Sequence, residues 1–80
     1  MAWRVLSHGG ETWHVHVAAE RRPNHESWQL VLSFRTPGAE QRRAFWAPYP
    51  LEATSKASLF AQAERIPEDA LQALLLAHVP

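Results

Sequence analysis

The sequence contains no cysteine, only three glycines in 80 residues, and no excess of charge of either sign. Without cysteine there can be neither disulfide bonds nor thiolate metal sites. The eight basic and eight acidic residues balance, which argues against a strongly basic, non-specific DNA-binding domain. A small chain that folds without disulfides is typical of the cytoplasm, and that is the location we expect.

Long hydrophobic runs are also absent. The run that includes residues 74–77 is far shorter than the ~20 apolar residues of a membrane span. The first residues lack a basic segment followed by an apolar stretch, so we expect no signal peptide. Seven of the eight basic residues are arginine, because Lys56 is the only lysine. Together with abundant alanine, this composition indicates a GC-rich bacterial genome.

Residues that common catalytic motifs use are scarce. Asp69 is the only aspartate, and its position just after Pro67 fits the first turn of a helix, where acids are favourable. Gly9 and Gly10 lack the spacing of a phosphate-binding loop and precede a strand pattern rather than a helix. No spacing links serine, histidine and an acid into a relay. We therefore expect a non-enzymatic protein without a cofactor.

The residues that are present indicate an α+β fold. The hydrophobic fraction is 46%, which is typical of a globular protein, and the length indicates one domain over residues 1–80. Residues 1–47 form a β-like part and residues 51–80 a helical part. Alternating patterns predict strands near residues 3–7, 13–19, 28–35 and 42–47. Pro48 and Pro50 are expected to end the β part, because proline cannot donate to a ladder.

The turn after the first strand sets the pairing of the first two strands. A two-residue Gly9-Gly10 turn pairs Ser7 with Thr12 and places Trp3 and Val5 opposite the histidines. A three-residue turn that includes His8 places Trp3 and Val5 opposite Val15 and Trp13, on one apolar face. Because burial selects register, the three-residue turn is favoured. Gly10 would then take the left-handed conformation.

Two short helices are predicted after the strands. The first covers about residues 55–65 and is capped by Thr54 or Ser55. The second begins at Pro67, a residue favoured at the first helical position. An antiparallel meander of three or four strands, covered on one face by these helices, is the predicted architecture. The expected core residues are Trp3, Val5, Trp13, Val15, Val17, Trp28, Leu30, Leu32, Phe34, Phe45, Leu59, Phe60, Ile66, Leu71, Leu74 and Leu75.

The uncovered sheet face is the main candidate for function. Alternation predicts that it combines cations, amides and apolar groups with one aromatic side chain. It is expected to display Arg4, Leu6, Thr12, His14, His16, Gln29, Val31, Ser33, Arg35, Arg42, Ala44 and Trp46. Within this set, the residues selected for partner binding are Arg4, His14, His16, Arg35 and Trp46.

The histidines offer a second interpretation. His14 and His16 are two residues apart on a strand and point to the same side, and imidazole suits zinc, copper or nickel. A metal site needs a third ligand, which His8 in the adjacent turn could supply. Two surface histidines on a β face are the simpler explanation, so we expect no metal.

Three functions remain open. The leading expectation is a protein-interaction module, with another protein or a second copy of the chain as its partner and no membrane. The alternatives are nucleic-acid or anion binding through the same sheet face, and a histidine metal site. The simpler interpretation, which competes with all three, is that the sheet face is an ordinary solvated surface that binds nothing.

Overall fold

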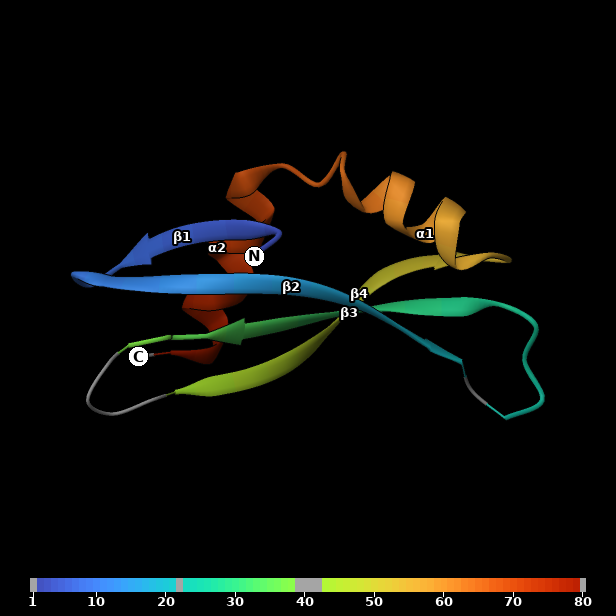
Figure 1. Cartoon of the computed structure of the whole chain (residues 1–80), viewed down its shortest axis with the longest axis horizontal. Coiled ribbons are helices and arrows are strands. Elements are labelled where there is room, and N and C mark those ends of the chain that lie inside the picture. Colours follow the sequence, from blue (N-terminus) through green and yellow to red (C-terminus); the bar gives the residue numbers. More distant parts are fainter. Residues whose placement is uncertain (1, 22, 39–42, 80) are drawn as a thin grey trace.

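The computed structural model describes residues 2–21, 23–38 and 43–79, and it confirms the α+β meander. The described part contains one four-stranded antiparallel sheet in the order β1-β2-β3-β4, followed by two helices on one of its faces (Figure 1). The molecule is elongated, with extents of 40 × 24 × 24 Å. The elements are β1 (Arg4–His8), β2 (Glu11–Arg21), β3 (Trp28–Arg35), β4 (Ala44–Ala53), α1 (Lys56–Ala63) and α2 (Glu68–His78).

The turn between β1 and β2 corrects the predicted register. It has two residues, Gly9 and Gly10, with φ of 59° and 79°, and it pairs Ser7 with Thr12. A two-residue turn with positive φ at both positions matches the right-handed twist of the flanking strands. Leu6 therefore enters the core at 1% exposure, whereas Val5 is 52% exposed.

Strand β4 continues beyond the predicted end of the β part. It runs through Pro48 and Pro50 to Ala53, so the β part ends six residues later than 47. In the sheet order β4 pairs only with β3, which makes it an edge strand. Proline is tolerated on an edge, where its missing N–H can face away from the neighbouring strand.

A bulge accompanies these prolines. Leu30 pairs with Tyr49 but Gln29 pairs with Glu52, so the register shifts between Gln29 and Leu30. The side-chain amide of Gln29 donates to the carbonyl of Tyr49 and lies 3.5 Å from that of Leu51. The amide thus replaces ladder hydrogen bonds that the bulge removes, as buried backbone groups require.

Both helices begin where the sequence indicates. The Ser55 hydroxyl accepts a hydrogen bond from the Ser58 N–H at 3.1 Å and caps α1. Pro67 precedes α2, whose first turn carries the two expected acids. Helix α2 crosses behind the sheet in Figure 1. It reaches β1 through Gln72, which donates to the Ser7 carbonyl at 3.0 Å, and its last residue, His78, lies against β4.

The core lies between the sheet and the helices. Most expected residues are buried or packed against the core, including Trp3, whose backbone bends just before β1. Val5 was wrongly placed there. The buried hydrophobic residues are Leu6, Trp13, Val15, Leu30, Leu32, Phe34, Ala47, Leu59, Ala63, Ile66, Leu71, Leu75 and Val79.

Aromatic side chains close the core at the β4 edge. Phe45 stacks between Phe34 at 4.7 Å and His78 at 4.5 Å, measured between ring centroids. Trp13 meets Phe45 at a tilt, and the guanidinium of Arg43 lies 5.2 Å from the Trp13 ring centroid. This aromatic cluster joins the C-terminal end of α2 to three strands, and such pairs contribute about 0.5–1.5 kcal/mol each beyond their burial.

Leu32→Ala tests which side of β3 faces the core. Leu32 is fully buried, so truncation should lower the free energy of unfolding by about 2–5 kcal/mol. Leu76→Ala is the matched control, because Leu76 on α2 is 57% exposed, and it should change stability by less than about 0.5 kcal/mol. Urea denaturation followed by tryptophan fluorescence measures both. Equal effects would contradict the described packing.

Candidate functional site: the open sheet face

The side of the sheet opposite the helices, which we call the open face, is arranged in rows across the strands. His14 pairs with Arg35, and His16 pairs with Ser33. Ser33 in turn pairs with Trp46 on β4. Paired residues on neighbouring strands point to the same side. The structure therefore brings His14, His16, Arg35 and Trp46 together on the open face, as the sequence predicted.

Arg4 was expected on this face, and that placement is wrong. The two-residue turn places Arg4 and Leu6 on the side of the helices. The Arg4 guanidinium donates to the carbonyls of Glu64 and Ile66, each at 3.1 Å. Arg4 therefore holds β1 to the segment that connects α1 and α2, and Val5 takes its place on the open face. Arg42, also expected on the open face, lies outside the described residues.

Trp46 is the most exposed aromatic side chain on the open face. Its exposed fraction is 64%, although a tryptophan normally buries most of its large apolar surface. Val5 is exposed on the same face, with two strands between it and β4. The open face thus has an exposed apolar side chain on each outer strand, and the polar residues His16, Ser33 and Arg35 lie on the two strands between them.

His16 and Arg35 interact directly. A guanidinium nitrogen of Arg35 lies 3.1 Å from Nε2 of His16. Because a guanidinium can only donate, Nε2 must accept, so the neutral ring carries its proton on Nδ1. Partial burial lowers the pKa of His16 below its ordinary value of 6.5, and the positive charge of Arg35 lowers it further.

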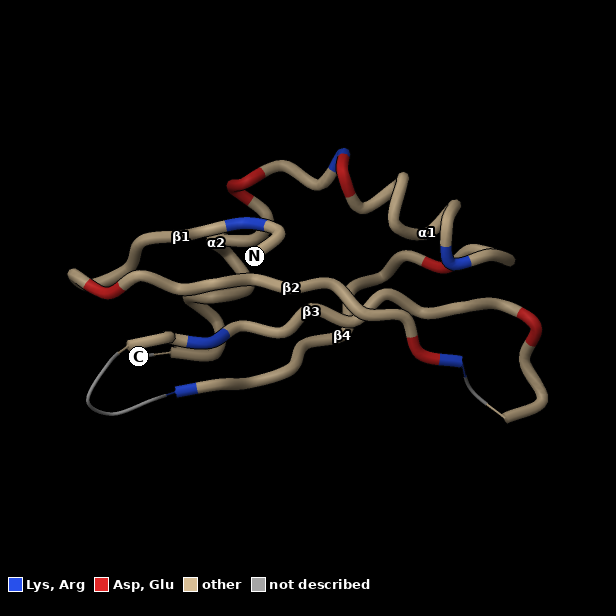
Figure 2. The backbone as a smooth tube through the Cα atoms, viewed as in Figure 1, with Lys and Arg blue, Asp and Glu red and all other residues tan. Residues whose placement is uncertain are grey.

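The charge on the open face changes sign along the strands. Beyond Trp46 comes a row of small apolar residues, in which Val31 pairs with Ala18 and Pro48. The next row is acidic at both ends, because Gln29 pairs with Glu20 and with Glu52. Figure 2 shows acidic residues on β2 and β4 toward the end of the sheet that α1 covers.

The cations at the acidic end lie on the other side of the sheet. Arg21 and Lys56 both approach the ring of Trp28, at 5.9 and 4.5 Å from its centroid. Trp28 packs against the core on the helix side. Sequence reasoning missed Glu20 and Glu52 because the predicted strands stopped at residues 19 and 47. The available signal was the two-residue spacing, because Glu20 falls on the same side as His14 and His16, and Glu52 on the same side as Trp46.

The histidines do not converge on a metal. The two-residue turn places His8, by strand alternation, on the helix side of β1, whereas His14 and His16 lie on the open face. Within the described residues no group of three or more His, Asp or Glu side chains is placed to hold a metal ion. The third ligand that the sequence interpretation needed is therefore on the wrong side of the sheet.

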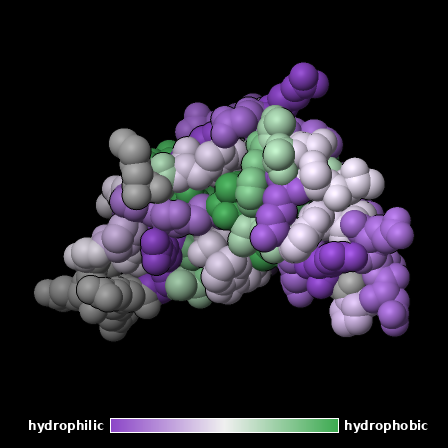
Figure 3. All heavy atoms as spheres, turned by 45° about the vertical axis from the view of Figure 1, so that its right-hand side comes forward, coloured by the Kyte–Doolittle hydropathy of each residue, from purple (hydrophilic) through white to green (hydrophobic). Residues whose placement is uncertain are grey.

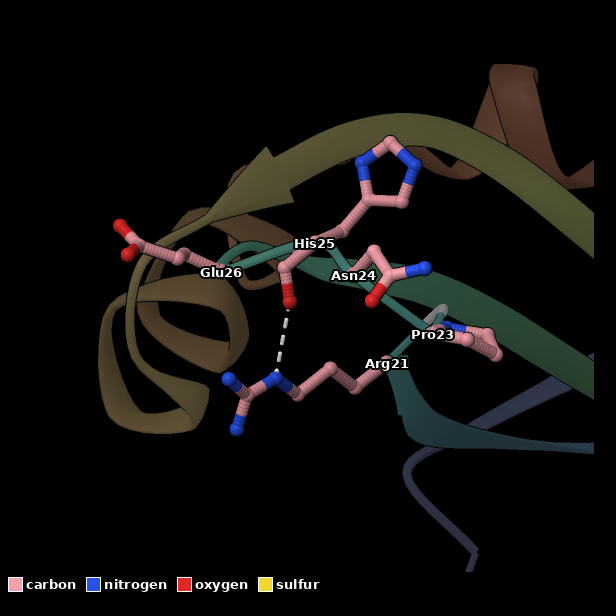
Figure 4. Close-up of a pocket in the computed structure, with 5 residues that line it drawn as sticks. All are labelled: Arg21, Pro23, Asn24, His25 and Glu26. Atoms are coloured by element: carbon pink, nitrogen blue, oxygen red, sulfur yellow. Dashed lines mark hydrogen bonds between the residues drawn. The ribbon is translucent and has the colours of Figure 1, made fainter.

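A hollow with a volume of about 520 Å³ lies in the loop between β2 and β3. It is lined by exposed polar residues, and the Arg21 Nε donates to the His25 carbonyl at 2.9 Å. Figure 4 shows Arg21 reaching toward this carbonyl while the Glu26 side chain points away. An open loop of exposed side chains has neither the enclosure nor the convergent polar groups of a small-molecule site.

Hydrophobic residues gather in the middle of one face of the molecule, and hydrophilic residues lie toward the ends of that face (Figure 3). None of the helices in the described ranges is long and apolar enough to cross a membrane.

Comparisons with models of protein families, with curated proteins and with solved structures find no match to this chain. The function must therefore be inferred from the open face itself.

Replacing His14 and His16 together by alanine should leave folding almost unchanged. Neither side chain is in the buried core, so the free energy of unfolding should change by less than about 0.5 kcal/mol. Chemical denaturation of the double variant measures this. A loss of several kcal/mol would show that the two histidines are structural.

His16 should titrate below 6.5 in the folded protein. Since protonation is less favourable in the folded than in the unfolded chain, the His16 contribution to stability is complete above about pH 6.5 and falls as the pH decreases below it. Arg35→Gln removes a positive charge and should raise the midpoint. NMR titration of the His16 ring protons measures both midpoints, and a wild-type value at or above 6.5 would contradict the described contact.

Proposed function

We propose that this chain is a non-enzymatic protein-interaction domain that binds another protein chain through its open face. The observation that carries the proposal is Trp46, which is 64% exposed on the edge strand β4. Tryptophan and arginine are the residues that most often dominate protein–protein binding energy. On the open face Trp46 and Arg35 lie on neighbouring strands and in adjacent rows, since Trp46 pairs with Ser33 and Arg35 pairs with Ala44.

The rigidity of the site supports the same function. Trp46 and Arg35 stand on paired strands, and the residues directly before them, Phe45 and Phe34, stack on each other on the core side of the sheet. Side chains on a packed sheet lose little backbone freedom on binding, which lowers the entropic cost of association. A flat, preformed surface suits a folded protein partner.

Nucleic-acid binding by the same face has weaker support. Sheets that bind single-stranded RNA stack two or three bases on aromatic side chains, and Trp46 is the only aromatic residue among the described residues of the open-face rows. Glu20 and Glu52 at one end would repel phosphates. The formal net charge of the chain is also zero. A protein partner therefore fits the face better.

The expected bacterial origin and cytoplasmic location remain part of this proposal. They are supported by the arginine-rich and cysteine-free composition.

Site-specific photo-crosslinking tests the proposed function. A benzoylphenylalanine at position 46 should give a covalent adduct with a protein in cells that express the chain, because Trp46 lies at the centre of the proposed contact. The same group at Ala61, an exposed position on α1, is the matched control and should give at least ~10-fold less adduct. Mass spectrometry identifies the captured chain.

Two outcomes would contradict the proposed function. Equal adduct yields at positions 46 and 61 would show that the open face is an ordinary solvated surface. An adduct with nucleic acid that disappears with added salt would favour phosphate binding instead, since such binding weakens steeply with salt.

A further inference from the structure

We infer that the protein bound by the open face is a second copy of this chain, in a two-fold symmetric dimer with the two sheets face to face. This inference depends on the proposed function and specifies its partner. It is carried by the order of charged and apolar rows along the open face, which makes the face complementary to itself.

The rows have a simple sequence along the strands. The basic end contains His14 and Arg35 in one row and His16 in the next. The acidic end contains Glu20 and Glu52. In the described residues of the rows between these ends there is no acidic side chain. Reversing the strand direction therefore brings the basic end of one copy onto the acidic end of the other.

A two-fold axis in the plane of the interface produces this reversal. The axis would run across the strands, between the row of Ser33 and the row of Val31. In such an isologous contact each favourable pair occurs twice. Arg35 of each copy would lie over Gln29 of the other, between Glu20 and Glu52, which flank Gln29 on the neighbouring strands.

The apolar residues fall at the centre of this arrangement. Across the axis, the row of His16, Ser33 and Trp46 faces the row that contains Val31 and Pro48. Trp46 of each copy would cover Val31 and Pro48 of the other, and would be buried in turn. A tryptophan that is buried against apolar residues, between charge pairs at both ends of the contact, resembles a binding hot spot. Face-to-face sheets with strands about 30° apart also pack closely.

An acidic partner of another kind fits the face less well. Arg35 would attract it, but Glu20 and Glu52 would repel it along the same strands. A basic partner meets the opposite conflict. Like charges in contact repel unsuitable partners. The open face, which has a positive end and a negative end, therefore fits a surface with a negative end and a positive end in the facing positions. A second copy of the chain with its strands reversed has such a surface.

Charge reversal in two separate variants tests the dimer. In a dimer of Arg35→Glu chains, Glu at position 35 of each copy would face Glu20 and Glu52 of the other. In a dimer of Glu20→Arg/Glu52→Arg chains, Arg35 of each copy would face the two introduced arginines. Each variant alone should dimerise at least ~10-fold more weakly than wild type. An equimolar mixture should regain dimers, because a heterodimer restores opposite charges at both contacts. Arg65→Glu, an exposed change outside the face, is the matched control.

Light scattering after size-exclusion chromatography gives the masses, and circular dichroism confirms that each variant is folded. Wild type should show twice the chain mass of 9.1 kDa, with dissociation on dilution. Trp46→Ala should also be monomeric at concentrations where wild type is a dimer. Dimers that form in the mixture but not with either variant alone would support the proposed contact, because only this contact places position 35 of one copy against positions 20 and 52 of the other.

The inference is overturned if wild type is a monomer at every concentration, or if the mixed variants dimerise no better than each alone. Crosslinking at position 46 then separates the two proposals. An adduct with a different protein would leave the open face as an interaction surface with another partner. Absence of any position-specific adduct would overturn the proposed function as well.

Discussion

The short turn between β1 and β2 determines which side chains reach each face of the sheet. Because a side chain changes face with every residue, a one-residue difference in the turn would exchange the two faces of β1. Gly9 and Gly10 both take positive φ, which glycine adopts without steric cost. Leu6 thereby fills the core, and Arg4 can reach the carbonyls between the helices.

The same turn shapes the candidate site indirectly. It moves Arg4 and Leu6 to the helix side and separates His8 from the other two histidines, so the open face loses a cation and a third metal ligand while Val5 replaces Leu6 on it. What remains is a surface with Trp46 at its centre and charges of opposite sign at its ends. The order of charged and apolar rows along this face indicates which partner it could bind, and no single residue on the face does so.

Much of the fold was predictable from local patterns. The alternation over Trp28–Arg35 identified β3 correctly, and Ser55 and Pro67 marked the starts of the helices. The pairing of β1 could not be predicted in this way, because the prediction placed Trp3 and Val5 together on the apolar face and assumed a regular strand through residue 3. The backbone bends there instead, so Trp3 joins the core from the helix side without requiring Val5 to do so.

The sequence by itself determined the class of fold, the core side of β3 and the helix starts, since these depend on short-range periodicity and on the chemistry of capping residues. Only the tertiary structure decided the extent of β4 and the charge pattern of the open face. Pro48 and Pro50 are acceptable in a strand only at a sheet edge, and whether a strand is at the edge depends on the whole topology. Glu20 and Glu52 become neighbours only through their shared pairing with Gln29, a contact between residues that are far apart in the chain.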